Sequence, residues 1–529
     1  MCQWGTAYNN AISKNCPFLT FCETQTEPLI IEAGSIITWD HLMIIDRPVI
    51  VMPTASLIIT CEARFSTEAY VEVRRGAKLT VDGALLTNLC PDGFWPGIQV
   101  WGNPSKLQPD PANGINGIND AGIVQVINGA TIQHARTAIS TGAWAQGGSV
   151  AWSHFGGAIY CENSSFIDNR RGVEFMKYIY PNKSKFINCT FSESGNYVDN
   201  SVGVTIWECN DITFNRNTFR FLDVAGIFGV DFGAKIYDHN QFWNLPTGIE
   251  SYNTLFYKGN LDIGQNNSNP NYFKNNTRHI YCASGNGLDR VNIINNDLFN
   301  ATGNGIIIEG SCHYRIENNR FRNIPLAVVS DASGDDHNLI KCNQFDKHEN
   351  GILFRDINFQ TQFLDNCFPE NIDIGVVVNP GASIRSEQGD NSRVANNCLQ
   401  SKVDIYVPSP FSVFDYFSRQ QPGALYCDPH DIYCETPSDN LSDGGFNNYY
   451  LHKIKVNTSI NCSDNKEEQI VPTLSITEAR SKIYFVSSLL NLYPQNTTLQ
   501  NEFQLALSLI HISEPTRRTP ISYAVFCLK

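Results

Sequence analysis

Side chains suited to acid–base chemistry and anion binding recur at one place in this chain, six and seven residues ahead of a repeated Asn. Carboxylates, imidazoles and a guanidinium on one rim would supply a general acid, a general base and a clamp for an anionic sugar. The same residue types also suit polar, solvated turns that do no chemistry. Both interpretations stay open. The candidate residues are Asp289 and Arg290, His313 after Cys312, and Asp335, Asp336 and His337.

An internal repeat in the sequence indicates the structural elements that must position these side chains. Taking Asn319 as the origin, Ile316 lies three places before it, Phe321 two after it and Val328 nine after it. Several columns agree at once, which is the signature of a repeat architecture. Clean origins are separated by 23 or 24 residues, and a degraded copy is expected near Asn271. The other origins are Asn217, Asn240, Asn296, Asn343, Asn366 and Asn397, with Cys189 and Ser164 in the same place in two earlier copies.

The recurring columns indicate stacked coils of short strands. Leucine-rich repeats need Leu at fixed offsets, whereas these columns hold Phe, Ile, Val and Tyr, which favour strands. Asn at the origin suits a turn, because it tolerates left-handed backbone and hydrogen-bonds locally. Stacking would place successive Asn residues about 4.8 Å apart, so that their amides form a ladder. We therefore predict an all-β solenoid of three-strand coils with a period of about 23 residues and an inward stack of Phe side chains.

This pattern resembles the right-handed parallel β-helix proteins, the architecture of pectate lyases and of many secreted bacterial surface proteins. The segment VEVRRGAKLTVDGALLTNLCPDGFWPGIQVWGN, residues 71–103, is similar to the first coils of long extracellular β-helix proteins exported by type IX secretion. The resemblance covers residues 27–408 and implies the fold. It does not imply one activity, because such folds include lyases, hydrolases and non-enzymatic adhesins.

One short motif resembles a known catalytic element. SGDDHN, residues 333–338, is similar to the Gly-Asp-Asp element of polygalacturonases, which would correspond to Gly334, Asp335 and Asp336. The Gly-His-Gly and Arg-Ile-Lys elements expected in later coils have no counterpart, and no Asn-Thr-Asp precedes the motif. A complete catalytic set is therefore missing from the sequence.

The ends of the chain differ from the repeat region. Residues 1–26 form an irregular N-terminal remnant, and residues 27–408 form the predicted solenoid. Residues 409–470 have the composition of an irregular, loop-rich segment. Residues 471–506 are expected to cap the solenoid with an amphipathic helix over 475–494, where Ser475 and Glu478 have capping-box spacing. Residues 507–529 resemble translated sequencing adapter, and we expect them to be non-native.

The composition of the chain limits the kinds of partner that it is expected to bind. The formal net charge of −14 disfavours nucleic-acid binding, and no apolar run is long enough for a membrane span. We expect no cofactor and no metal site, since the 17 Cys show no CxxC spacing. Cys367 and Cys398 both follow an origin Asn, so they are expected to stack, either as a disulfide or as buried thiols. The chain is expected to be a monomer, and to be extracellular or on the cell surface with its signal and sorting segments missing.

Two classes of function follow. The first is a non-catalytic surface scaffold that serves in adhesion or binds a polysaccharide or cell-surface glycan. The alternative is a polysaccharide lyase or glycoside hydrolase that acts on acidic polysaccharides. The sequence favours the first, because no complete catalytic constellation is present, and it leaves open whether the chain is an enzyme.

Overall fold

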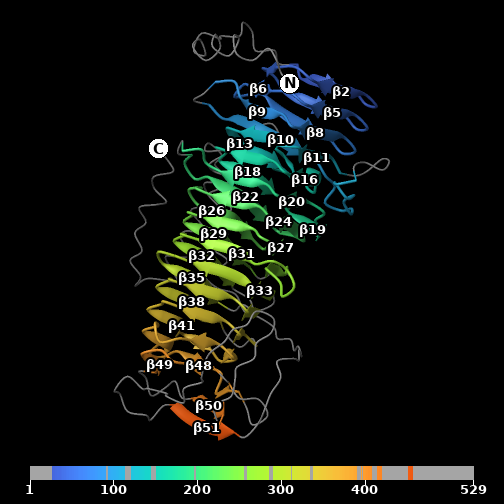
Figure 1. Ribbon diagram of the computed structural model, residues 1–529. Helices are drawn as coiled ribbons and strands as arrows, with labels where there is room; N and C mark the ends of the chain where they lie inside the picture. Colours follow the sequence, from blue (N-terminus) through green and yellow to red (C-terminus); the bar gives the residue numbers. More distant parts are fainter. Residues whose placement is uncertain are drawn as a thin grey trace, which may run out of the picture.

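The chain folds as a parallel β-helix, in which each coil adds one strand to each of three long sheets. The computed structural model describes residues 27–90, 93–113, 121–144, 150–195, 198–254, 259–284, 290–310, 313–333, 337–389, 395, 397–407, 414–419 and 451–456. The three sheets have 15, 13 and 14 strands and are called sheets A, B and C here. Figure 1 shows the coils stacked in chain order, with the labels of sheet A along the left side and those of sheet B along the right.

The chain visits the sheets in the order A, B, C. Sheet A holds β1 (Leu29–Ile31), β4 (Val49–Val51), β7 (Tyr70–Val73), β10 (Trp95–Val100), β13 (Ala135–Ser140), β18 (Arg171–Phe175), β22 (Val202–Trp207), β26 (Ala225–Val230), β29 (Thr247–Asn253), β32 (Arg278–Ser284), β35 (Asn304–Gly310), β38 (Leu326–Asp331), β41 (Asn350–Arg355), β45 (Ile374–Val378) and β49 (Val403–Tyr406). Sheet B holds β2 (Ile36–Trp39), β5 (Ser56–Ile59), β8 (Lys78–Asp82), β11 (Ile123–Ile127), β16 (Ala158–Glu162), β20 (Lys185–Ile187), β24 (Ile212–Asn215), β27 (Ala234–Tyr237), β30 (Leu261–Ile263), β33 (Arg290–Ile294), β36 (His313–Glu317), β39 (Leu339–Lys341) and β43 (Gln362–Leu364).

Sheet C and four small sheets complete the described strands. Sheet C holds β3 (Met43–Ile45), β6 (Ala63–Phe65), β9 (Leu85–Asn88), β12 (Thr131–Gln133), β17 (Ser165–Ile167), β21 (Thr190–Ser192), β25 (Thr218–Arg220), β28 (Gln241–Trp243), β31 (Asn271–Lys274), β34 (Asn296–Phe299), β37 (Arg320–Arg322), β40 (Gln344–Asp346), β44 (Cys367–Phe368) and β48 (Cys398–Leu399). The small sheets pair β14 (Ala143–Trp144) with β15 (Val150–Ala151), β19 (Tyr178–Pro181) with β23 (Cys209–Asn210), β42 (Ile357–Asn358) with β46 (Ser383–Ile384), and β47 (Glu387–Gln388) with β50 (Phe414–Arg419) and β51 (Leu451–Val456). Within the described ranges one 3₁₀ turn, η2, is found, and it covers Trp152–His154.

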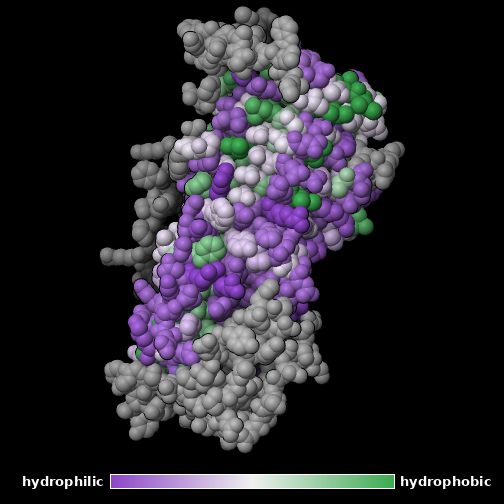
Figure 2. Space-filling view, viewed as in Figure 1, coloured by the Kyte–Doolittle hydropathy of each residue, from purple (hydrophilic) through white to green (hydrophobic). Residues whose placement is uncertain are grey.

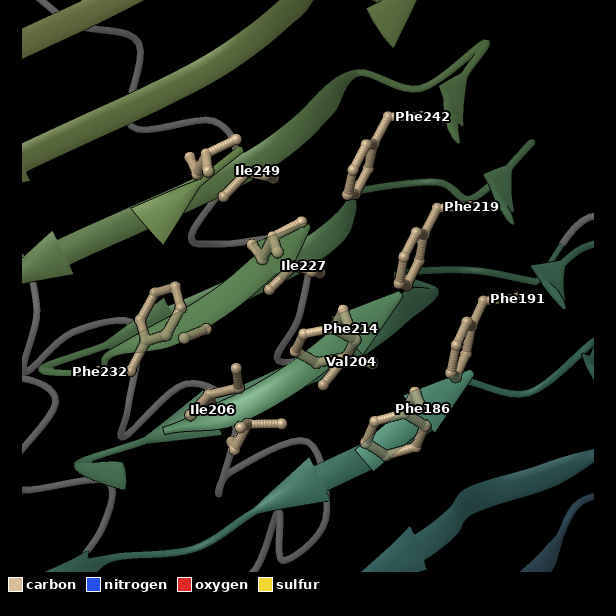
Figure 3. Packing of buried hydrophobic residues seen from close by; sticks show 14 of the residues in the cluster. Phe186, Phe191, Val204, Ile206, Phe214, Phe219, Ile227, Phe232, Phe242 and Ile249 are labelled. Atoms are coloured by element: carbon tan, nitrogen blue, oxygen red, sulfur yellow. The ribbon is translucent and has the colours of Figure 1, made fainter. Parts of the chain in front are cut away.

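The interior of the solenoid is a continuous apolar column, and its most regular part is the predicted stack of Phe rings. Phe219 and Phe242 lie 4.8 Å apart between ring centroids and are almost parallel, at 3°. Phe345 stacks in the same way on Phe321 at 5.0 Å and on Phe368 at 4.6 Å. All of these side chains are fully buried. Figure 3 shows the rings of Phe191, Phe219 and Phe242 one above another beside aliphatic side chains of sheet A.

The predicted Asn ladder is also present, at the turn from sheet B to sheet C. Each ladder side chain donates from Nδ2 to the Oδ1 of the Asn in the next coil, as between Asn319 and Asn343 at 3.1 Å. Each also donates to a main-chain carbonyl of the preceding coil, so the amides are well satisfied although they are buried. Asn271 occupies its place in the ladder, which confirms the degraded copy. The ladder consists of Asn217, Asn240, Asn271, Asn296, Asn319, Asn343, Asn366 and Asn397.

One detail of the turn was predicted wrongly. The residue in left-handed conformation is the one before the ladder Asn, such as Asn295 or Asn318, and not the ladder Asn itself. A second left-handed position follows four residues after the ladder Asn, as at Asn244 and Asn275. The residue before the ladder Asn thus supplies the backbone reversal, and the ladder Asn supplies only the hydrogen bonds.

The ladder ends on a tyrosine outside the three long sheets. Asn397 Nδ2 donates to the hydroxyl of Tyr416 in β50 at 3.0 Å, and the Tyr416 side chain is buried. The strands β50 and β51 belong to the segment 409–470 and lie in parallel beside β47. The remnant 1–26, the helix expected at 475–494 and the tail 507–529 lie outside the described residues.

A column of glycines allows sheet A to pack closely against the Phe stack. A Cβ on Gly203 would lie 2.5 Å from the carbonyl oxygen of Gly226 and 2.8 Å from the Phe219 ring. Both distances are far below van der Waals contact, so a side chain here would push two coils apart. The same clash exists at Gly226 and Gly248. The column occupies the second residue of successive sheet A strands, and its other glycines are Gly172, Gly305, Gly351 and Gly375.

His279 occupies the place of a column glycine in β32 and gives stability a pH dependence. Burial lowers the pKa of the imidazole to about 3, and Asn276 Nδ2 lies 3.0 Å from its Nδ1. The folded pKa lies below the unfolded value near 6.5, so this stabilisation is complete above pH 6.5 and is lost as the pH falls towards 3. We expect the His279 contribution to the free energy of unfolding to be about 2 kcal/mol smaller at pH 4.5 than at pH 6.5.

Urea unfolding of the wild type and of His279→Gln at both pH values measures this difference. His279→Gln should have a flatter pH dependence than the wild type. His41→Gln should not, because the His41 side chain is 70% exposed. An unchanged pH dependence in His279→Gln would show that the buried imidazole does not contribute.

The two stacked cysteines are not joined to one another. Cys367 lies opposite Cys398 in the register of β44 and β48, as the repeat predicts. Cys398 is a buried thiol, whereas Cys367 is in a disulfide, so the bridge between the two is not formed. Cys61 and Cys90 are also in disulfides.

Candidate functional site

Three of the predicted site residues lie on the A–B edge, the line of turns that joins sheet A to sheet B. Arg290 begins β33 and His313 begins β36, and the two are register partners. His337 precedes Leu339 by two residues, and Leu339 pairs with Arg315, two residues after His313. The three therefore occupy equivalent places in successive coils. His337 is exposed and the other two are partly exposed. Asp289, Asp335 and Asp336 lie outside the described residues.

A buried polar network holds the turn that carries His337. Ser330, at the end of β38, lies 2.8 Å from the Tyr314 hydroxyl and donates to Asn358 Oδ1 at 2.7 Å. Ser333, in the turn, lies 2.9 Å from Ser330 Oγ, and its main-chain N–H donates to the same Asn358 oxygen. Asn338 closes the network, accepting from the Tyr314 N–H and donating to the Ser333 carbonyl. Buried networks of this kind rigidify the segments that they join.

The ends of sheet A strands bring further charged groups to the A–B edge. Glu309 in β35, Asp331 in β38 and Arg355 in β41 are register neighbours in three successive coils. Arg355 Nη1 lies 3.9 Å from Asp331 Oδ2, and the Tyr281 hydroxyl donates to Glu309 Oε2 at 2.5 Å. Two carboxylates and a guanidinium thus lie next to the turns that carry the predicted histidines.

Tyr281 acts as a hydrogen-bond donor at this edge. Burial, followed by the charge of Glu309, raises the pKa of the phenol, so it stays neutral at physiological pH. The guanidinium of Arg278 lies 4.8 Å from the Tyr281 ring centroid and 3.5 Å from Glu250 Oε2. A neutral phenol that donates to a carboxylate fixes the position of Glu309 and is poorly suited to abstract a proton.

The charged residues at the ends of the sheet A strands also recur at a fixed place in the sequence, although they were not among the predicted site residues. Glu309, Asp331 and Arg355 each lie three residues after the recurring inward aliphatic residue of their coil. Sheet alternation makes that place outward-facing, next to the turn into sheet B. The predicted site residues lie around the starts of the sheet B strands, on the other side of the same edge.

No group of three or more His, Cys, Asp or Glu within the described ranges is placed to hold a metal ion. In the part of the chain that the structure describes, no helix has the length and apolarity needed to cross a membrane.

Comparison with known proteins gives a likeness of fold. No protein-family model matches the chain, and no curated protein matches it. Among solved structures, the chain is similar to the periplasmic alginate epimerase AlgG, with 14% identity and a TM-score of 0.27, over 73% of this chain and 78% of that one. A mutant structure of the same epimerase gives 15% identity and a TM-score of 0.28 over the same shares of the two chains.

Proposed function

We propose that the protein is an extracellular or cell-surface scaffold that binds a glycan at the A–B edge without cleaving it. The observation that supports this most is the combination of charged and imidazole side chains with a buried network that fixes the turn beneath them. Glu309, Asp331 and Arg355 offer acceptors and donors for sugar hydroxyls, and His313 and His337 adjoin them. Fixed polar groups on a rigid scaffold bind at a low cost in conformational entropy.

The chemistry of the edge supports binding more than cleavage. Catalysis by a glycosidase needs an acid and a base on opposite sides of the scissile linkage. Glu309 and Asp331 project from the same column of sheet A, and each already contacts a donor, Tyr281 or Arg355. The disulfides at Cys61, Cys90 and Cys367 support an oxidising compartment, as expected of a secreted protein.

A polysaccharide lyase or hydrolase is the second candidate, and one observation favours it. Register neighbours in a sheet lie about 4.8 Å apart. The carboxyl groups of Glu309 and Asp331 could therefore approach the separation of about 5–5.5 Å that retaining glycosidases use. This candidate predicts that loss of either carboxylate abolishes release of sugar from an acidic polymer.

The test uses the full chain with pectin-like and alginate-like polymers, measuring unsaturated and reducing sugar by absorbance and binding by calorimetry. We expect no release of sugar. We expect Glu309→Gln and Asp331→Asn to weaken binding by about 5-fold each, as for lost hydrogen bonds to charged groups. His337→Ala should leave folding intact, because the imidazole is exposed.

If the wild type depolymerises one of these polymers and Asp331→Asn or His337→Ala abolishes the reaction, the protein is an enzyme and the binding proposal is wrong. Glu68→Gln is the matched control, since Glu68 is exposed in the turn from sheet C to sheet A, away from this edge. Equal loss of binding in that control would show that the A–B edge is not the binding site.

A further inference from the structure

The outer face of sheet C carries a column in which cations and aromatic rings alternate from coil to coil. Successive register partners run from β25 through β28, β31 and β34 to β37, and the same outward place is followed throughout. This cation–aromatic column consists of Arg220, Trp243, Lys274, Phe299 and Arg322. All five side chains are partly or fully exposed. Figure 2 shows one face of the molecule, where hydrophilic residues predominate over the middle coils and hydrophobic ones gather at the N-terminal coils.

The three cations of the column form no ion pair with a carboxylate among the described residues, although Asp346 in β40 is the register partner of Arg322. Lys274 Nζ and the Arg322 guanidinium both lie 5.8 Å from the Phe299 ring centroid, and the Arg220 guanidinium lies 6.0 Å from Phe221. Outward cations elsewhere behave differently: Lys235 contacts Asp211 at 2.6 Å and Arg315 contacts Glu317 at 2.9 Å. A chain with a net charge of −14 has carboxylates in excess, so three unpaired cations in one line stand out.

The corner beside the column contains an aromatic residue at a place that favours Asn. Phe221 has a φ of 57° and is 52% exposed, whereas the same turn position in later coils holds Asn244, Asn275 and Asn300. A bulky side chain in left-handed conformation costs about 1 kcal/mol or more. The strain, together with the exposed ring, is a feature that folding alone does not require.

The neighbouring outward column of sheet C is compatible with an anionic ligand. It consists of Thr218, Gln241, Tyr272, Asp297 and Arg320. Its one carboxylate, Asp297, lies 3.9 Å from Arg320. A small hollow with a volume of about 100 Å³ adjoins these two residues and is also lined by Asn318 and Gln344.

We propose that the cation–aromatic column binds a linear acidic polysaccharide that lies along the solenoid axis, with acidic and neutral sugars in alternation. Neighbouring strands are about 4.8 Å apart, which is close to the advance of an extended chain per pyranose ring. Cations on every second coil would then meet a carboxylate or sulfate on every second sugar. The rings of Trp243 and Phe299 on the coils between would stack on the neutral sugars. This site is separate from the A–B edge and stands whether or not that edge binds a glycan.

A single-stranded nucleic acid uses similar chemistry, since its bases stack on aromatic rings and its phosphates contact cations. The glycan is favoured because every nucleotide carries a charge, whereas the column offers one cation for every two coils. The surplus of negative charge on the rest of the chain also opposes a densely charged polymer.

The experiment compares four probes by calorimetry with the full chain. They are a hyaluronan oligosaccharide, which alternates a uronate with a neutral sugar, a polygalacturonate oligosaccharide with a uronate at every place, a neutral cello-oligosaccharide and a single-stranded DNA oligomer. We expect the alternating oligosaccharide to bind most tightly, and the neutral one and the DNA not to bind. The triple variant Arg220→Gln, Lys274→Gln, Arg322→Gln should weaken binding by about 10- to 100-fold, as for three lost surface charge contacts.

The matched control removes the same charge from the outer face of sheet B, by Lys185→Gln, Lys235→Gln and Arg315→Gln. It should stay within about 2-fold of the wild type, apart from a small effect of net charge. Trp243→Ala alone should weaken binding by about 10-fold, the range of a lost stacking contact. Equal weakening in both triple variants, binding of DNA as tight as that of the oligosaccharide, or no binding of any acidic oligosaccharide would each overturn the proposal. The A–B edge variants are expected to bind the hyaluronan oligosaccharide normally, so the two proposals fail independently.

Discussion

Phe345→Ala should lower the free energy of unfolding by about 3–5 kcal/mol, the cost of truncating a buried aromatic residue in a core that relaxes only partly. Phe345 is fully buried between two parallel rings, at 5.0 Å from Phe321 and 4.6 Å from Phe368. Removal of the middle ring leaves a cavity that neither neighbour can fill, because both are held by their own strands. Urea unfolding followed by far-UV circular dichroism measures the change.

Phe359→Ala is the control for this prediction. Phe359 is 49% exposed, so its truncation should change the free energy of unfolding by less than about 0.5 kcal/mol. A loss below about 1 kcal/mol in Phe345→Ala would mean that the Phe stack does not carry the stability of the solenoid in these coils.

Asn319→Ala should be comparably destabilising, by about 4 kcal/mol, although it removes a polar side chain. The Asn319 amide accepts from the N–H and the Nδ2 of Asn296, at 3.0 and 2.9 Å. It donates to the Ile293 carbonyl at 2.7 Å and to Asn343 Oδ1 at 3.1 Å. Alanine leaves these buried groups without partners, and each such group costs about 1–3 kcal/mol. Equilibrium unfolding of the variant gives the measured loss.

Asn residues that lie four places after a ladder Asn are nearer the surface, and one of them provides a control for the Asn319→Ala prediction. Asn323 Nδ2 donates to Asn300 Oδ1 at 3.0 Å, but both side chains are reached by water. Asn323→Gly keeps the left-handed conformation available and should cost less than about 1 kcal/mol. If the buried and the exposed Asn changes had equal effects, burial of the ladder would not be the source of its stability.

The core of the fold was predictable because its side chains recur at fixed places in the repeat. Phe321 and Asn319 are large or polar residues at fixed offsets, and each has one place in a coil where it can be satisfied. The glycine column could not be identified in the same way. Gly203 and Gly226 are required by the approach of a ring and a carbonyl from other coils, which spacing along one coil does not reveal. The left-handed residue was misplaced by one position for a related reason, since both residues of the turn are often Asn.

The functional surface was predictable only in part. The sequence placed Arg290 and His313 in register, because each lies six residues before a ladder Asn. It did not connect them with Glu309, which lies four residues before His313 near the end of the preceding strand. The cation–aromatic column was not predictable from the repeat for a different reason. Its members vary in type from coil to coil, so a search for repeated residues passes over Arg220, Trp243 and Lys274.

The Asn ladder also has a direction. Every amide points its nitrogen towards the later coil and its oxygen towards the earlier one, from the Cys189 N–H that bonds Asn217 to the Tyr416 hydroxyl that accepts from Asn397. A new coil inserted anywhere inside this row can offer an oxygen to one neighbour and a nitrogen to the other. A coil appended after Asn397 would displace the tyrosine that ends the row. Lengthening by internal duplication is therefore compatible with both ends of the solenoid, whereas growth at its C-terminal end requires a new terminator.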